Sequence, residues 1–329
     1  MRLILDTDPS NGIPGADIDD ALAIGLAVRS PEIDLAAITV VAGNVPVDLG
    51  LHCALELLEA AGATNVPVYR GAARPLVQDP VGWRARLDAR RDENASQLLW
   101  RDVHPTTVSM SVQSTPAAQA LVDLVNAEPN EITVVAIGPL TNLATAILLD
   151  RDWPSKVRQI VVMAGAFDLP NVLQELNAAY DPEATHLVFN SVAPLLIVPL
   201  DVTMQTFMRV HDQDRLDAAG TPLAVYLGRT VRPWVTWLAQ RFGRDGCPLH
   251  DPLALAALID PEVIRSRIAS VDIQLRGSLT RGRTVAWDAT EQEMLHSGVH
   301  LSEARPSSIA HDVDNLRFMP LLLGPDCDS

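Results

Sequence analysis

Short apolar runs alternate with amphipathic segments along most of the chain, as in proteins whose strands alternate with helices. Runs rich in β-branched and other apolar residues predict strands at residues 2–5, 33–41, 66–69, 131–137, 157–163, 194–199, 271–275 and 307–310. Periodicity and helix-start signals predict helices at residues 20–29, 47–61, 116–127, 140–149, from 182 onward, 222–242, 250–259 and 315–323. This alternation predicts an α/β fold, a single large domain over residues 1–329 with a mostly parallel, Rossmann-like open sheet flanked by helices.

Polar residues directly follow several of the predicted strands. Asp6 and Asp8 follow the first strand, Asn44 follows the second, an IGPLTN segment follows the fourth, and Met163 ends the fifth. In open α/β sheets, ligands bind beyond the carboxyl ends of the strands. We therefore expect these residues to converge on one rim of the sheet.

Two segments interrupt the alternation. Residues 79–107 are polar and contain Trp83, Trp100 and His104, and the helix near 221–248 is aromatic in a chain with only 4% aromatic residues. Long irregular segments within compact domains are often functional. We therefore predict that both segments are lids; surface insertion and core or interface packing are the alternatives.

Composition excludes several classes of protein. With 48% hydrophobic and 20% charged residues, the 329-residue chain has enough apolar surface for one large core. A net charge of −16 argues against a nucleic-acid partner, because proteins that bind the phosphate backbone carry basic patches. The cysteines Cys53, Cys247 and Cys327 are too few and too scattered for a disulfide framework or a zinc site. No run reaches the roughly 18 apolar residues of a membrane helix, and the N-terminus has no signal-peptide core, so we expect a cytoplasmic protein without membrane contact.

The strongest chemical signal is a group of acidic residues near the N-terminus. The segment DTDPSNGIPGADIDDA contains Asp6, Asp8, Asp17, Asp19 and Asp20. Such closely spaced carboxylates repel one another unless a cation lies among them, and several carboxylate ligands with flexible spacing suit Ca²⁺ better than Mg²⁺. The spacing does not fit an EF-hand. For Asp17 alone, helix capping or a solvated loop is the favoured reading.

The same segment resembles the opening motif, D-x-D-P-G-x-D-D-A, of the inosine-uridine nucleoside hydrolase family. Further segments resemble that family's motifs in the same order: VAGNV, IGPLTNLA, VVMAGA, ELNAAYDPEATHLVFN, LDVTMQ, LHDPLALAALIDP and GSLTRGRTVAWD. The matches run from Ile4 to Asp288. The resemblance implies the nucleoside hydrolase fold and hydrolysis of ribonucleosides to ribose and free nucleobase. It also implies Ca²⁺ as cofactor, a ribonucleoside as small-molecule partner, and a homodimer or homotetramer.

The resemblance further implies roles for residues at matching positions. Asp8 would be the general base for the attacking water, and His250 would face the nucleobase as candidate acid for the leaving group. The implied calcium ligands are Asp8, Asp20, Asp251 and the backbone carbonyl of Ile137. The implied substrate-binding residues are Asp19, Asn44, Met163, Asn171, Glu175 and Asn177. Such a set fits glycosidic hydrolysis, which needs an activated water and stabilisation of an oxocarbenium-like transition state.

The chain departs from the family pattern in three places. An insertion in the first motif adds Asp17, which becomes a further candidate for metal or sugar contact. Leu176 replaces the Phe of the family's E-F-N, and the spacing from Asn171 to Glu175 is short. The family's His in the first mobile loop has no clear match, and His104 is only a candidate for it.

Two other classes of function remain as alternatives. Haloacid-dehalogenase-like phosphatases also begin with a strand and D-x-D, but they need a basic residue near the phosphoryl group. Lys156, the only lysine, precedes a strand in an unrelated context. A non-catalytic binder of calcium and nucleosides on the same fold is the other alternative. The joint presence of Asp8, Asp20, His250 and Asp251 argues against it.

Overall fold

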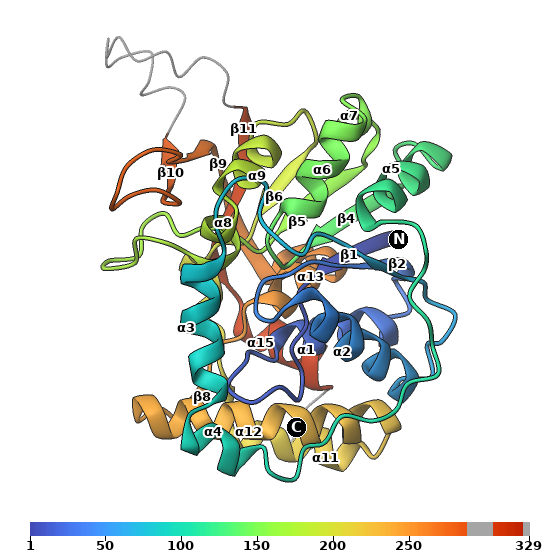
Figure 1. Ribbon diagram of the computed structural model, residues 1–329, viewed down its shortest axis with the longest axis vertical. Helices are drawn as coiled ribbons and strands as arrows, with labels where there is room; N and C mark the ends of the chain where they lie inside the picture. The colour runs from blue at the N-terminus through green and yellow to red at the C-terminus, as the bar shows by residue number, and fades with distance from the viewer. Residues whose placement is uncertain (288–304, 325–329) are drawn as a thin grey trace.

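A nine-stranded sheet runs through the computed structural model, which describes residues 1–287 and 305–324 (Figure 1). Its strands are β1 (Arg2–Thr7), β2 (Asp34–Val40), β3 (Val68–Arg70), β4 (Ile132–Ala136), β5 (Gln159–Val162), β6 (Leu195–Ile197), β9 (Ile264–Ile273), β10 (Thr284–Trp287) and β11 (Pro306–Val313). They lie in the order β3-β2-β1-β4-β5-β6-β11-β9-β10. Strands β1 to β6 and β11 are parallel, whereas β9 and β10 are antiparallel additions at one edge. The predicted α/β fold with a mostly parallel open sheet is confirmed.

Helices cover both faces of the sheet and enclose two apolar cores (Figure 1). One face is covered by α1 (Asp19–Arg29), α2 (Val47–Ala60), α13 (Asp251–Ile259) and α15 (Asn315–Leu323), and the other by α5 (Ala117–Ala127), α6 (Thr141–Leu149) and α9 (Pro182–Phe189). Leu3 and Leu5 of β1 point into the first core and Ile4 into the second. Because both faces are covered there, the central strands β4, β5 and β6 are almost continuously apolar.

Several helices begin where the sequence predicts. The Asp181 side chain accepts from the backbone N–H of Ala184 (3.1 Å) to cap α9, and Thr221 does the same for α12 (Pro222–Phe242) through Ala224 (3.2 Å). In both helices a proline occupies the first turn, where its missing N–H costs no hydrogen bond.

The stretch at 79–107 is less irregular than expected. It contains α3 (Val81–Arg91) and α4 (Asn94–Leu99). No residue of α3 is buried, so the helix leaves no apolar periodicity in the sequence. Strand β9 also begins seven residues earlier than predicted, because its first half is largely exposed and lacks an apolar run.

Shorter elements complete the fold. They are α7 (Trp153–Lys156), α8 (Leu176–Tyr180), α10 (Leu200–Thr203), α11 (Gln213–Ala219), the 3-10 turns Val210–Asp212 and Pro261–Val263, and the ribbon of β7 (Met208–Arg209) and β8 (Gly246–Cys247). Among the described residues, no helix is both long and apolar enough to cross a membrane. Cys53 and Cys247 are buried free thiols, and Cys327 lies outside the described residues.

Candidate active site

The order of the strands determines where the site lies. The chain moves outward from β1 to β2 and β3 on one side, and from β4 to β5 and β6 on the other, so the direction of winding reverses between β1 and β4. Asp8 follows β1 directly and Ile137 follows β4 directly. Ligands bind at such a switch point in open α/β sheets. The predicted convergence of strand ends on one rim is therefore observed at this point.

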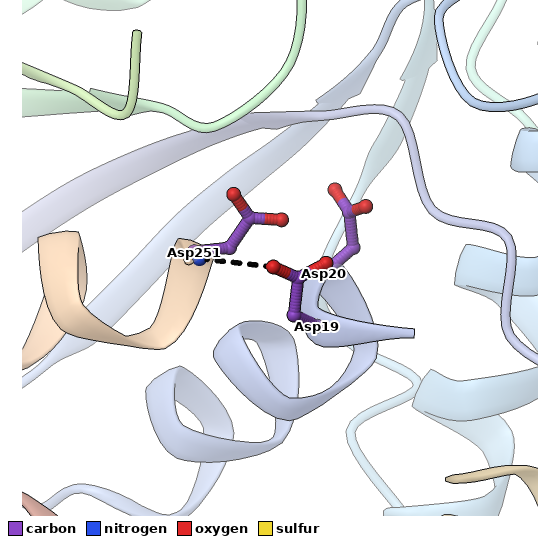
Figure 2. A group of neighbouring side chains, drawn as sticks. All are labelled: Asp19, Asp20 and Asp251. Atoms are coloured by element: carbon purple, nitrogen blue, oxygen red, sulfur yellow. Dashed lines mark hydrogen bonds between the residues drawn. The ribbon is translucent and has the colours of Figure 1, made fainter. Parts of the chain in front are cut away.

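Three buried carboxylates form a cluster next to this rim. Asp19 and Asp20 come from the first turn of α1, and Asp251 comes from the first turn of α13 (Figure 2). Each of the three offers an oxygen within 4.8 Å of the others. The Asp19 Oδ2 atom also accepts from the backbone N–H groups of His250 (3.0 Å) and Asp251 (3.2 Å). The positive ends of two helix dipoles thus face these carboxylates.

Asp8 lies against this cluster and is 1% exposed. Its backbone N–H donates to Oδ1 of Asp20 (3.1 Å), and its own Oδ2 accepts from the backbone N–H of Asn44 (2.6 Å). Its other oxygen, Oδ1, is buried and has no hydrogen-bond partner among the described residues. A Cβ at Gly43 would lie 2.0 Å from Oδ2, and one at Gly138 would lie 2.6 Å from Oδ1. Only glycine at both positions leaves room for the carboxylate.

Burial makes the charged form of these acids unfavourable. Loss of water raises the pKa of Asp8 to about 8, with the negative charge of Asp19 adding to the rise and the Asn44 hydrogen bond opposing it. Burial and neighbouring carboxylates also raise the pKa of Asp20 and of Asp251 well above the usual range. A bound cation would offset both the loss of water around the carboxylates and the repulsion between their negative charges. The oxygen-only donors and the partnerless Oδ1 of Asp8 therefore fit a hard divalent cation.

A cavity of about 210 Å³ opens beside the carboxylates. Eight of the residues singled out from the sequence line it: Asp19, Asn44, Ile137, Met163, Glu175, Asn177, His250 and Asp251. Asp17, Gln174, Leu176 and Leu200 also line it; of these, Gln174 and Leu200 had no predicted role. Asp8 and Asp20 are not among the lining residues. Eight of the eleven residues that the resemblance implies for the site thus line one small cavity.

Two of these side chains also organise the wall of the cavity. Glu175 caps α8, accepting from the backbone N–H groups of Asn177 (2.7 Å) and Ala178 (2.9 Å) and, across the loop, from that of Gly165 (2.8 Å). The Asn177 Nδ2 atom donates to the carbonyls of Ile137 (2.8 Å) and Met163 (3.0 Å). A carbonyl oxygen has two lone pairs, so the Ile137 oxygen retains one for another partner.

His250 precedes α13 and is held on one side. Its Nδ1 lies 2.8 Å from the hydroxyl of Thr203, which belongs to the LDVT segment. Burial lowers the pKa of His250, and the nearby Asp19 partly opposes the effect. The imidazole is therefore biased toward its neutral form. No role is predicted for Thr203 from the sequence, although its LDVT segment resembles a family motif.

Other candidate residues lie elsewhere. Asn171 is exposed, has a φ of 65°, and lines a second cavity of about 540 Å³ instead of the inner one. This outer cavity is also lined by Trp83, Arg86, Leu87 and Arg90 of α3, and it shares Asp17, Asn44, Gln174 and Leu176 with the inner cavity. The predicted lid at 79–107 thus borders the outer cavity through α3.

The second predicted lid and two single candidates do not reach these cavities. Tyr226, Trp234 and Trp237 of α12 are buried in the first core, and within the described part of the chain no α12 residue lines either cavity. His104 is exposed and borders a separate small cavity that includes His52 and Cys53. Lys156 precedes β5, at the opposite end of the strand from the site, and its Nζ binds Asp150 (3.0 Å) and Asn126 (2.8 Å). This position does not supply the cation that a dehalogenase-like phosphatase requires.

The fold and the site together define an α/β protein with a cluster of buried carboxylates, able to hold a metal ion, at the switch point of its sheet. The chain belongs to the inosine-uridine preferring nucleoside hydrolase family, whose model matches residues 3–320. It is 34% identical to the inosine-uridine preferring nucleoside hydrolase of Leishmania major over 292 residues, covering 86% of this chain and 87% of that protein. It is 31% identical to the pyrimidine-specific ribonucleoside hydrolase of Escherichia coli strain K12, and the match covers 98% of this chain and 97% of that protein. A solved plant nucleoside hydrolase matches with a TM-score of 0.84 and 30% identity, covering 98% of this chain and 97% of that one.

Proposed function

We propose that this protein hydrolyses the N-glycosidic bond of ribonucleosides, releasing ribose and free nucleobase at a calcium-dependent site. One observation carries the proposal: among the residues that the structure describes, Oδ1 of Asp8 is buried and has no hydrogen-bond partner, and it lies beside the Asp19, Asp20 and Asp251 cluster. An uncompensated buried carboxylate is costly, so a chemical role for Asp8 accounts for its presence there.

We assign the cation to Asp8, Asp20, Asp251 and the backbone carbonyl of Ile137. Calcium is favoured over magnesium because several carboxylates of flexible spacing suit the larger ion. When bound, calcium supplies a Lewis acid that lowers the pKa of a water molecule and orients hydroxyl groups. Asp19 lies close enough to the other two aspartates of the cluster to be an additional ligand.

The remaining roles follow from where each group lies. Asp8 acts as general base, because its Oδ1 is free to take a proton while Oδ2 is held by Asn44. The cavity-lining residues Asp19, Asn44, Met163, Glu175 and Asn177 bind the ribose. Asn171, in the outer cavity, is assigned to the part of the substrate that extends beyond the ribose. His250 faces the nucleobase with its Nε2, since its Nδ1 is bound to Thr203.

The proposal also covers which nucleobases the enzyme accepts and its oligomeric state. The names of the relatives include both an inosine-uridine preferring and a pyrimidine-specific enzyme, so they define ribonucleosides as the substrate class without choosing the base. The family resemblance favours a cytoplasmic homodimer or homotetramer. Segment 79–107 is proposed as the lid of the outer cavity.

The ribose assignment predicts strong discrimination against 2′-deoxyribonucleosides. A missing 2′-hydroxyl leaves buried polar groups unpaired, typically at about 1–3 kcal/mol for each neutral group. Release of free base should therefore be much slower from 2′-deoxyinosine than from inosine, and likewise for the uridine pair. The measurement is kcat/KM for each pair in calcium-containing buffer. Similar values within a pair would refute the ribose assignment.

A further inference from the structure

One arginine of α3 contacts the site without lining either cavity. The Arg84 side chain is 17% exposed and reaches back from α3 to the turn that follows β2. Its guanidinium donates to the carbonyl oxygen of Gly43 and to that of Asn44 (3.0 Å). Asp88, one helical turn later, fixes the guanidinium by accepting from both Nε (3.3 Å) and Nη2 (2.7 Å).

The peptide group between Gly43 and Asn44 joins this arginine to Asp8. Arg84 binds the carbonyl end of that peptide group, and the N–H end donates to Oδ2 of Asp8 at 2.6 Å. A positive charge on the carbonyl polarises the amide and strengthens its N–H as a donor, because hydrogen bonds in series reinforce one another. The side chain of Asn44 extends the connection by donating to Oδ2 of Asp20 (3.2 Å).

We propose that Arg84 is a positioning residue for the reaction, which orients the Asp8 carboxylate through the Gly43–Asn44 peptide group. The inference rests on the proposed function, in which Asp8 is the base. It links the catalytic geometry to the lid helix. Displacement of α3, none of whose residues is buried, would remove both Arg84 hydrogen bonds to the turn that follows β2.

The contacts that Arg84 makes with the two carbonyls and with Asp88, here called the clamp, require an arginine. A guanidinium presents several donors in one plane and can bind two carbonyls and a carboxylate together, whereas an ammonium acts as a single compact charge. Arg84→Lys should therefore restore only part of the function. Within the described part of the chain, the side chain of Arg91, on the same helix, makes only an ion pair with its neighbour Asp92, so Arg91→Met is a control that also removes one arginine from α3.

The experiment compares the calcium-loaded wild-type protein with its Arg84→Met, Arg84→Lys and Arg91→Met variants. Small misplacement of a catalytic group can cost about 10²-fold in rate, so we expect kcat of Arg84→Met to fall about 10- to 100-fold. Its melting temperature should match that of Arg91→Met, and millimolar guanidinium should restore part of its kcat. If kcat stays within twofold of Arg91→Met, or falls only together with the melting temperature, the positioning role is wrong.

A second readout does not depend on turnover. In NMR spectra of the calcium-loaded protein, the Asn44 amide proton should shift upfield in Arg84→Met, as its hydrogen bond to Asp8 weakens, and stay in place in Arg91→Met. An unchanged Asn44 resonance in Arg84→Met would overturn the inference even if the proposed function holds. Absence of nucleoside hydrolysis by the wild-type protein would instead refute the proposed function, and the amide shift would still report on the clamp.

Discussion

At the residue scale, two neighbours in the LHDP segment have different surroundings. The Asp251 carboxylate belongs to the cluster with Asp19 and Asp20, whereas the His250 imidazole is partly buried, biased toward neutrality and bound by Thr203. A neutral imidazole can still donate from Nε2 to a leaving group. The His250 imidazole contributes to the rate only where the leaving group needs a proton. Substrates with different leaving groups therefore distinguish the role of His250 from that of Asp251.

This difference predicts opposite substrate dependence for two variants. His250→Ala should slow natural ribonucleosides by about 10²–10⁴-fold, the usual range for general acid catalysis, and should barely affect p-nitrophenyl riboside, whose leaving group departs as a stable anion. Asp251→Ala should impair both substrates, because it disturbs the carboxylate cluster. Steady-state kcat/KM with both substrates is the measurement. Equal effects of His250→Ala on the two substrates, or no effect on either, would move the acid role to another residue.

The sequence identified the acids of the site but not the groups that fit around them. Asp8, Asp19 and Asp20 are predicted from the close spacing of carboxylates in the N-terminal segment, whereas Asp251 is predicted only from the resemblance of its LHDP segment to the family motif. The close approach of Gly43 to Asp8 is not predictable from the sequence, because it depends on how the turns after β1 and β2 pack. Asp8, Asp20 and Asp251 are the predicted side-chain ligands; the structure groups Asp20 and Asp251 with Asp19, and Asp8 lies against this group through its backbone N–H, which donates to Asp20.

At the element scale, helices and strands are predictable from the sequence where they carry a buried apolar run or a clear capping residue. Strand β4, all but the first residue of β1 and the last four residues of β2 are buried and match apolar runs in the sequence, and α9 and α12 begin at their predicted capping residues. Helix α3 was missed because nothing in its sequence records a buried face. Its position depends instead on Arg84 and on a contact with the inserted loop at Gly15.

The contact between Gly15 and α3 predicts that Gly15→Ala displaces the helix, in addition to straining its own backbone. Gly15 has a φ of +70°, and a Cβ there would lie 2.6 Å from the carbonyl oxygen of Arg90 in α3. Gly62 has the same φ with nothing within 4 Å, so it is the matched control. Gly62→Ala should cost only the backbone strain, about 1 kcal/mol. Gly15→Ala should also displace α3, seen as faster proteolysis within residues 81–99 and a raised KM.

The contact would be unimportant if the two variants behaved alike. Equal proteolysis rates and equal KM values for Gly15→Ala and Gly62→Ala would show that the inserted loop does not hold α3 in place.

At the scale of the whole molecule, the buried acids make stability depend on both pH and cation. The pKa of Asp8 is raised to about 8 and that of Asp6 to about 7, chiefly by burial, whereas both are near 3.8 when unfolded. Between those values the folded, metal-free protein binds more protons than the unfolded chain. Its stability therefore falls as pH rises from about 4 to 8.

Cation binding should reverse part of that loss. Calcium binds the ionised carboxylates and stabilises the native state that holds it, so the rise in melting temperature on adding calcium should be larger at pH 8 than at pH 6. Differential scanning calorimetry of chelator-treated protein with and without calcium gives both shifts. Equal shifts at the two pH values would contradict the assignment of the buried carboxylates as ligands.

The most direct test of the account is the rate at which free nucleobase appears from a ribonucleoside, measured for metal-stripped wild-type, calcium-restored wild-type and calcium-loaded Asp8→Asn protein. The account predicts that stripping abolishes turnover and that calcium restores it. It also predicts that Asp8→Asn lowers kcat by about 10²–10⁴-fold, as expected for loss of a general base. Undiminished base release by the metal-stripped protein, or by Asp8→Asn, would contradict it.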